Sequence, residues 1–224
     1  MAHEKIDRNG TRTTIDTASK KAIVETYTLL KQRNNPDGWS PDFQVRNFRY
    51  ASRFIMDAGA SADATVLDVG CGTGKFFDTW RTMHLGTYTG IDMSPSPNDR
   101  LKTDVITAGG KFIVGEFTSA TLDQVDFIVA SGVVSVGTPS NKYDFFTLYV
   151  QKMLTLARKG IYLNYWEEGM NDGSIPAFLD YDSSQIDVIL SRMISASQLT
   201  HFGRATDHVT YDGKQYSQQH IFIQ

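Results

Sequence analysis

The feature that most constrains the fold of this chain is a run of three glycines at alternate positions, Gly70, Gly72 and Gly74. A short apolar, β-branched segment that ends in Asp68 comes before them, and a segment with aromatic residues at helical spacing follows. This pattern predicts a buried parallel strand, a tight turn and the start of a helix. Because glycine has no Cβ, a ligand can approach the backbone N–H groups of such a turn closely, at the strand end where doubly wound sheets bind ligands.

The spacing of the turn separates it from two common nucleotide loops. A phosphate-binding P-loop requires a glycine where Val69 stands and a Ser or Thr where Phe76 stands. The dinucleotide fingerprint requires its third glycine where Lys75 stands. The observed Asp-x-Gly-x-Gly-x-Gly spacing fits neither. A glycine turn that only packs a helix against a strand is the alternative interpretation.

Composition sets the broad class. The 224 residues are enough for one α/β domain, and 41% apolar and 21% charged residues are ordinary for a globular protein. The net charge of −3 and the pI of about 5.9 argue against a large nucleic-acid-binding face without excluding a local basic patch. No N-terminal apolar core typical of a signal peptide is present, and no apolar run approaches the ~20 residues that span a bilayer. We therefore expect a cytoplasmic protein without a membrane partner.

The single cysteine, Cys71, lies inside the glycine turn, so no intrachain disulfide can form. We expect it to be a small buried side chain rather than a nucleophile.

Helical and strand patterns alternate along the chain and end in a predicted β-hairpin with an Asp212-Gly213 turn. We divide the chain into a helical extension or cap, residues 1–59, and an α/β domain, residues 60–224, within one globular unit. Arg158, Lys159 and Gly160 are predicted to form the basic end and cap of the helix before the fifth strand. The predicted helices are about 16–33, 41–59, 76–84, 98–108, 143–157 and 182–194, and the predicted strands before the hairpin are 66–69, 87–91, 111–114, 125–130 and 161–165.

The two helices of the extension have two interpretations. They either lie over the ligand site, where Trp39 and Gln44 can reach the ligand, or cover one face of the sheet.

A carboxylate, Asp92, ends the strand after the glycine turn, roughly 20 residues beyond it. This is the position from which an acidic residue binds ribose hydroxyls. The alternative role of Asp92 is to cap the following segment.

Four segments together resemble one family. Residues 66–74, 88–95, 112–117 and 126–132 match, in order and spacing, the class I S-adenosylmethionine-dependent methyltransferases. The resemblance covers about residues 38–224, and the run 157–160 followed by Asn164 is similar to small stand-alone bacterial and phage members. It implies an α/β, doubly wound, Rossmann-like fold: a seven-stranded, mostly parallel sheet with an antiparallel last strand, here with an N-terminal helical addition.

The resemblance also implies S-adenosylmethionine as cofactor and a set of residues that would bind it. The methionine part would lie on the glycine loop, the ribose on a carboxylate and the adenine at the end of the third strand, with the transferred methyl group beyond the fourth strand. The residues implied are Asp68, Gly70, Cys71, Gly72, Thr73 and Gly74 for methionine, Asp92 for ribose, Met93, Glu116 and Phe117 for adenine, and Ser131 beside the methyl group.

Several motifs of related enzymes are missing from this sequence, and their absence narrows the possible classes of methyl acceptor. The segment Ser131-Gly132-Val133-Val134 stands where amino-methylating DNA enzymes of this fold carry a Pro-Pro-aromatic motif. Cys71 is not in a Pro-Cys motif, and strand four does not end in the Asp of the metal-dependent catechol-type enzymes, so we expect no metal. We predict methyl transfer to a small-molecule or sugar-type acceptor. The alternatives are a macromolecular acceptor, either nucleic acid or protein, and a non-catalytic protein that only binds the cofactor.

Candidate groups for proton transfer lie in the C-terminal third. His201 and His208 are candidates because histidine titrates near neutrality, and Tyr165 is a third. Asn164 and Trp166 are further candidate contacts of the acceptor at the end of strand five. A purely structural role is the alternative for each.

Overall fold

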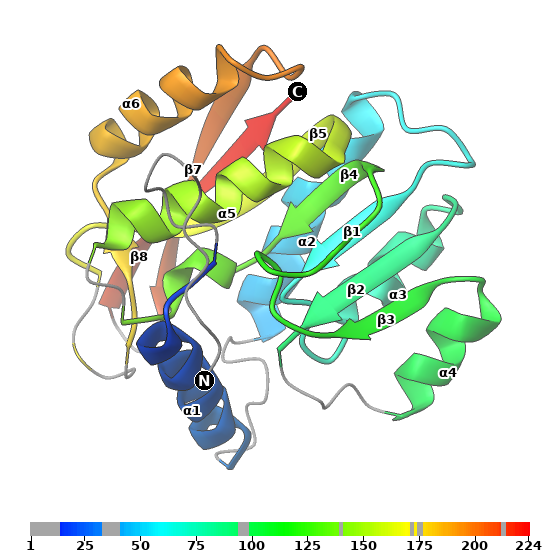
Figure 1. Ribbon diagram of the computed structural model, residues 1–224, viewed down its shortest axis with the longest axis horizontal. Coiled ribbons are helices and arrows are strands. Elements are labelled where there is room, and N and C mark those ends of the chain that lie inside the picture. Colours follow the sequence, from blue (N-terminus) through cyan, green and yellow to red (C-terminus); the bar gives the residue numbers. More distant parts are fainter. Residues whose placement is uncertain are drawn as a thin grey trace.

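One mixed β-sheet forms the centre of the computed structural model (Figure 1), which describes residues 14–32, 41–93, 99–138, 141–170, 173, 177–211 and 214–224. The strand order is β3-β2-β1-β4-β5-β8-β7, and the short β6 pairs with β5. Strands β1 to β5 run parallel, whereas β8 runs antiparallel to both β5 and β7. The strands are β1 Val66–Val69, β2 Tyr88–Asp92, β3 Lys111–Val114, β4 Val125–Ala130, β5 Ala157–Glu167, β6 Asp180–Tyr181, β7 Phe202–Tyr211 and β8 Lys214–Ile223.

The predicted architecture is confirmed, with the two-residue strand β6 as an eighth strand that the sequence analysis did not predict. The predicted C-terminal hairpin is present, although its turn, Asp212-Gly213, lies outside the described residues. The helices are α1 Thr17–Gln32, α2 Pro41–Asp57, α3 Lys75–Thr82, α4 Asp99–Thr107, the 3-10 helix η1 Val133–Ser135, α5 Lys142–Leu156 and α6 Ser183–Ile194.

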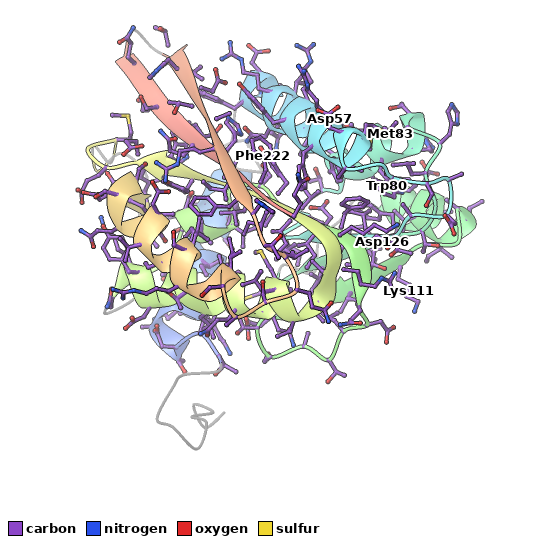
Figure 2. All side chains as sticks on the ribbon, turned by 90° about the horizontal axis from the view of Figure 1, so that it is seen from above. Asp57, Trp80, Met83, Lys111, Asp126 and Phe222 are labelled. Carbon is purple, nitrogen blue, oxygen red and sulfur yellow. The ribbon has the colours of Figure 1, made fainter. Side chains whose placement is uncertain are left out.

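Helices cover both faces of the sheet, which explains why β1 and β4 are buried along their whole length. Figure 2 looks along the layers and shows α2 and α6 on opposite sides of the sheet, with Trp80 and Phe222 on the α2 side. Side chains alternate along each strand, so Tyr162 joins the core under α2 and α3 whereas Leu163 joins the core under α5 and α6. The two cores together hold the central strands in place.

The extension covers the sheet with one helix and contacts its edge with the other. The C-terminal half of α2 packs Ala51, Phe54 and Ile55 into the core on its side of the sheet. Helix α1 lies beside the segment after β3, where Lys20 Nζ is 3.7 Å from a carboxylate oxygen of Glu116. The interpretation of the extension as a cover for a sheet face therefore holds for the C-terminal half of α2.

The predicted helix cap at residues 158–160 is wrong, because these residues are part of β5. Helix α5 ends at Leu156, and the backbone is already extended at Ala157. Arg158 Nε and Lys159 Nζ each lie 3.3 Å from Asp126 Oδ1 at the start of β4. These ion pairs join residues far apart in the chain, so no local pattern revealed them.

Gly160 lies where the ring of Phe54 packs onto β5. A Cβ at residue 160 would come within 2.6 Å of Phe54 Cζ, whereas a Cβ at Gly203 on β7 would meet nothing within 4 Å. We expect Gly160→Ala to lower the free energy of unfolding by ~1–3 kcal/mol, as overpacking of a filled core does. The matched control Gly203→Ala should change it by less than ~0.5 kcal/mol. Urea unfolding of both variants checks this, and equal effects would contradict the packing described.

Candidate active site

The glycine turn after β1 has a backbone conformation that explains its three glycines. The φ angles of Gly70, Gly72 and Gly74 are 67°, 51° and 76°, in the region that residues with a Cβ rarely adopt. A Cβ at Gly70 would also lie 2.7 Å from Val133 Cγ2, a side chain of η1 after β4. The turn therefore lies against the end of β4 and leads directly into α3.

Backbone hydrogen bonds attach the turn to the end of β2. The N–H groups of Gly70 and Cys71 donate to the carbonyl of Ile91 at 2.8 and 3.2 Å. The N–H of Gly72 donates to Asp92 Oδ2 at 2.9 Å. The structure thus brings the glycine loop and the predicted ribose-binding carboxylate together at the carboxyl edge of the sheet.

Asp68 lies beneath the loop, with its carboxyl group turned into the protein. Its Oδ2 accepts a hydrogen bond from the Tyr88 hydroxyl at 2.6 Å. Burial raises the pKa of Asp68 to about 7, although the hydrogen bond from Tyr88 acts in the opposite direction. The thiol of Cys71 is also buried, close to the backbone of Gly90. Both side chains support the loop from below.

The residues after β3 are engaged within the protein. Glu116 Oε1 accepts from the backbone N–H and the hydroxyl of Thr118, both at 2.6 Å, and Oε2 accepts from the N–H of Ser119 at 3.0 Å. Phe117 is 4% exposed, and its ring stacks on Tyr149 at 5.7 Å between centroids. The predicted contact of Phe117 with adenine is therefore not supported, because the ring is part of the core.

The end of β4 meets the N-terminal half of α2. Asn47 Nδ2 of α2 donates to Ser131 Oγ at 3.1 Å. The next residue, Gly132, has a φ of 76°, and its N–H donates to Asn164 Oδ1 on β5 at 2.7 Å. The predicted methyl-transfer position at Ser131 is thus bounded by one side chain from α2 and one from β5.

Two other residues singled out from the sequence lie near this end of α2. Gln44 accepts from Lys75 Nζ at 2.7 Å, which joins the N-terminal part of α2 to the start of α3. Trp166 on β5 packs against Phe43 with ring centroids 5.4 Å apart. Trp39 lies outside the described residues. The N-terminal half of α2 therefore lies over the carboxyl edge of the sheet.

The three candidates for proton transfer do not come together. Tyr165 points to the α5 and α6 side of the sheet, opposite Asn164, where its hydroxyl lies 2.9 Å from Ser183 Oγ and burial raises its pKa to about 12. His201 is exposed at the amino edge of the parallel strands, the edge opposite the glycine loop, next to the C-terminal Gln224. His208 is exposed on β7, with Nδ1 3.0 Å from Ser217 Oγ. None of these contacts supports a role as a base.

The sequence analysis missed a buried histidine, His220 on β8. Its Nδ1 lies 2.9 Å from the Tyr162 hydroxyl, and the ring of Tyr50 stacks on it at 3.9 Å. Burial lowers the pKa of His220 to about 4, with Asp207 acting weakly in the opposite direction. Two sequence signals mark this region, namely polar residues at positions 44 and 47 in the buried phase of α2 and at 218 and 220 in the buried phase of β8.

Several solved structures share the fold of this chain. The N-methyltransferase NodS from Bradyrhizobium japonicum, in complex with S-adenosylhomocysteine, has a TM-score of 0.64 and 16% identity, covering 88% of this chain and 98% of that chain. The magnesium protoporphyrin IX methyltransferase from Synechocystis, with bound S-adenosylmethionine, has a TM-score of 0.63 and 15% identity over 94% and 100%. The 1,6-didemethyltoxoflavin-N1-methyltransferase from Burkholderia thailandensis has a TM-score of 0.62 and 15% identity over 91% and 86%.

The fold is that of the class I methyltransferases. The family described as Methyltransferase domain matches residues 66–160, which contain the glycine loop, Asp92 and the end of β4. Residues 66–160 therefore contain a methyltransferase domain, and the chain has the fold of the class I S-adenosylmethionine-dependent methyltransferases. No curated protein sequence matches it.

The described residues contain no helix with the length and apolar character needed to cross a membrane. They also contain no group of three or more His, Cys, Asp or Glu side chains placed to hold a metal ion.

The buried Asp68 makes stability depend on pH. Because folding raises its pKa from 3.8 to about 7, its carboxyl group favours the folded state while neutral, and this contribution is lost as pH rises toward 7. We expect the stability of Asp68→Asn relative to the unmodified protein to increase between pH 4 and pH 8. Urea unfolding at several pH values measures the difference. The control Asp78→Asn, an exposed carboxylate on α3, should give a flat difference, and a flat difference for Asp68→Asn would contradict the raised pKa.

Proposed function

We propose that the protein transfers a methyl group from S-adenosylmethionine to a small-molecule or sugar-type acceptor. The observation that carries this proposal is the hydrogen bond from the Gly72 N–H to the Asp92 carboxylate. This hydrogen bond puts the glycine loop and Asp92 in direct contact, at the edge of the sheet where α/β proteins bind their ligands.

The residues at this edge fit the parts of the cofactor. Asp92 is partly exposed, and its carboxylate is an acceptor that suits the two hydroxyl donors of a ribose. The glycine loop would hold the methionine part, and Met93, half-buried directly after Asp92, would cover the adenine in place of Phe117. Glu116 would meet the adenine amino group only by sharing its carboxylate with Thr118 and Ser119.

The cofactor supplies a methyl group activated by a positively charged sulfur. The protein's part is to align the acceptor with that group and to exclude water, and such positioning is worth up to ~7–11 kcal/mol of the barrier. In this chain Ser131 and Gly132 mark the transfer position, and Asn47 and Asn164 hold them from two sides. We expect the acceptor to enter between α2 and the ends of β4 and β5.

Helix α2 covers the transfer position at Ser131, which favours a small methyl acceptor over a macromolecule. The N-terminal half of α2 lies directly on Ser131, which is only partly exposed. The net charge of −3 also gives no general attraction for nucleic acid. Among the similar structures, the named methyltransferases act on magnesium protoporphyrin IX and 1,6-didemethyltoxoflavin, and another is bound to a desmethyl analog of plantazolicin.

Calorimetric titration with S-adenosylmethionine and S-adenosylhomocysteine tests cofactor binding, and release of S-adenosylhomocysteine from a set of small acceptors tests turnover. Micromolar binding with turnover supports the proposal. Turnover only with RNA, DNA or protein would show that the methyl acceptor is a macromolecule and not a small molecule or sugar. Binding without turnover of any acceptor would favour the non-catalytic alternative.

The role of Asp92 gives a quantitative prediction. Asp92→Ala removes the charged acceptor of the ribose hydroxyls and should weaken binding of S-adenosylhomocysteine by ~1.5–3 kcal/mol, as for other hydrogen bonds to charged groups. Calorimetry measures this change. Asp78→Ala, the loss of a carboxylate on neighbouring α3, is the matched control and should bind normally. Unchanged affinity in a folded Asp92→Ala protein would remove Asp92 from the site.

The backbone of the loop gives a second prediction. Gly72 has a φ of 51°, and a branched side chain there strains the backbone and fills the space that the ligand must approach. We expect Gly72→Val to abolish detectable binding of S-adenosylhomocysteine in calorimetry while circular dichroism shows a folded protein. Gly203→Val, on β7 with nothing near its Cβ position, is the control and should bind normally. Tight binding by a folded Gly72→Val protein would mean that the loop is only structural.

A further inference from the structure

The interior beneath α2 changes from apolar to polar toward the carboxyl edge of the sheet. In α2 the buried residues are Ala51, Phe54 and Ile55 in the C-terminal half, but Gln44 and Asn47 nearer the N-terminus, beside Phe43. Strand β8 shows the same change on the same face. Phe222 faces the lower half of α2, and two and four residues earlier this face carries His220 and Gln218. A polar layer inside a core requires partners for its polar atoms.

Contacts connect this polar layer from α2 through the ends of β4 and β5 to β8. Asn47 bonds to Ser131, and the adjacent Gly132 bonds to Asn164. Asn164 pairs with His220 across β5 and β8, and Tyr50, one turn after Asn47 in α2, stacks on His220. These contacts thus run from Asn47 in α2 to His220 and back to Tyr50 in α2, and they include the transfer position.

Two of these side chains have a polar atom without a partner in the described part of the chain. Asn47 is 2% exposed, and its Nδ2 donates to Ser131, so that Oδ1 is left as a buried acceptor. His220 is 0% exposed, and its Nε2 is likewise unpartnered. An unsatisfied buried polar atom destabilises the folded protein, and a ligand that pairs with it removes this cost.

The hydrogen bonds of Tyr162 define the proton position on His220. Asn164 Nδ2 donates to the Tyr162 oxygen at 3.5 Å, so the hydroxyl proton of Tyr162 needs an acceptor. His220 Nδ1, at 2.9 Å, is that acceptor, because otherwise a buried hydroxyl proton would be unpaired. The lowered pKa keeps the ring neutral, with its single proton on Nε2. His220 therefore presents an N–H donor toward the interior.

We propose that the place between Asn47 and His220 is the methyl-acceptor subsite, and that it binds an uncharged group carrying both a hydrogen-bond donor and an acceptor, such as a lactam or a heteroaromatic amide. The donor pairs with Asn47 Oδ1 and the acceptor with the Nε2–H of His220. Gln218 Oε1, buried and unpartnered on the same face, supplies a second acceptor. This inference rests on the proposed methyl transfer and names the acceptor class for it.

The test begins with the tautomer of His220. In protein labelled with nitrogen-15 histidine, a correlation spectrum that links ring nitrogens to carbon-bound protons distinguishes the two neutral tautomers and the cation. His220→Gln assigns the signal, and His201→Gln, at the opposite edge of the sheet, is the matched control. We expect His220 to be neutral with its proton on Nε2 at pH 7. A proton on Nδ1, or a cationic ring, overturns the proposal.

The second stage uses small probes on protein saturated with S-adenosylhomocysteine. A set of uncharged lactams and heteroaromatic amides that includes 2-pyridone and uracil is added, and the Nε2 signal of His220 is followed. We expect 2-pyridone to shift it and N-methyl-2-pyridone, which lacks the donor, to bind at least tenfold more weakly. Asn47→Leu should remove this tenfold difference, and Ser52→Ala, which deletes another unpartnered polar atom of α2, should preserve it.

The outcomes separate this inference from the proposed function. If the protein does not bind S-adenosylhomocysteine, the proposed function itself fails. If it binds S-adenosylhomocysteine but no probe of the set shifts the His220 signal, the subsite is wrong and the unpartnered atoms are satisfied by enclosed water. Shifts that are equal in Asn47→Leu and the unmodified protein would also overturn the assignment.

Discussion

The attachment of the glycine turn to the end of β2 is the constraint on which the site depends. Three N–H groups of the turn donate to Ile91 and Asp92, the last two residues of that strand. A continuing strand directs successive N–H groups to opposite sides, so three consecutive N–H groups reach one neighbouring strand end only where the chain turns. This turn has positive φ angles at its glycines. On the other side Val133 packs against Gly70, which joins the turn to the end of β4. Three strand ends are thereby held in one arrangement.

Helix α2 performs two tasks because its polarity changes along its length. Its C-terminal half packs against β5 and β8 through side chains such as Phe54, which stabilises the sheet. Its N-terminal half places Asn47 on Ser131. Because both halves belong to one rigid helix, the packing of the apolar half sets the position of the polar half over the transfer site. The core and the site are thus mechanically coupled on this side of the sheet.

Local patterns predicted the parallel strands and the positions of the glycine turn and Asp92 at strand ends, because both depend on short segments whose roles follow from the alternation of helix and strand. Two features were beyond local patterns. Arg158 and Lys159 belong to β5 because Asp126, on another strand, pairs with them. Phe117 is in the core because Tyr149 of α5 stacks on it. In each case the deciding partner lies more than 30 residues away.

The burial of His220 was beyond the sequence for a related reason. His201 and His208 were selected by chemistry alone, whereas the hairpin register decides which histidine is buried under α2. The register pairs His220 with Asn164, and this places it in the polar layer. The periodic signal was present, since positions 218, 220 and 222 face one side, but the faces of β8 can be assigned only once β5 is known as its partner.

The tautomer of His220 also bears on the chemistry at the transfer position. A ring that donates through Nε2–H and accepts at Nδ1 from Tyr162 has no nitrogen available to take a proton from the acceptor. Its low pKa acts in the same direction, because protonation of a buried ring is costly. His220 therefore binds the substrate rather than deprotonating it, and the atom that receives the methyl group needs either its own nucleophilic lone pair or a base other than His220. Alignment, rather than proton abstraction by His220, is the contribution of this side of the site.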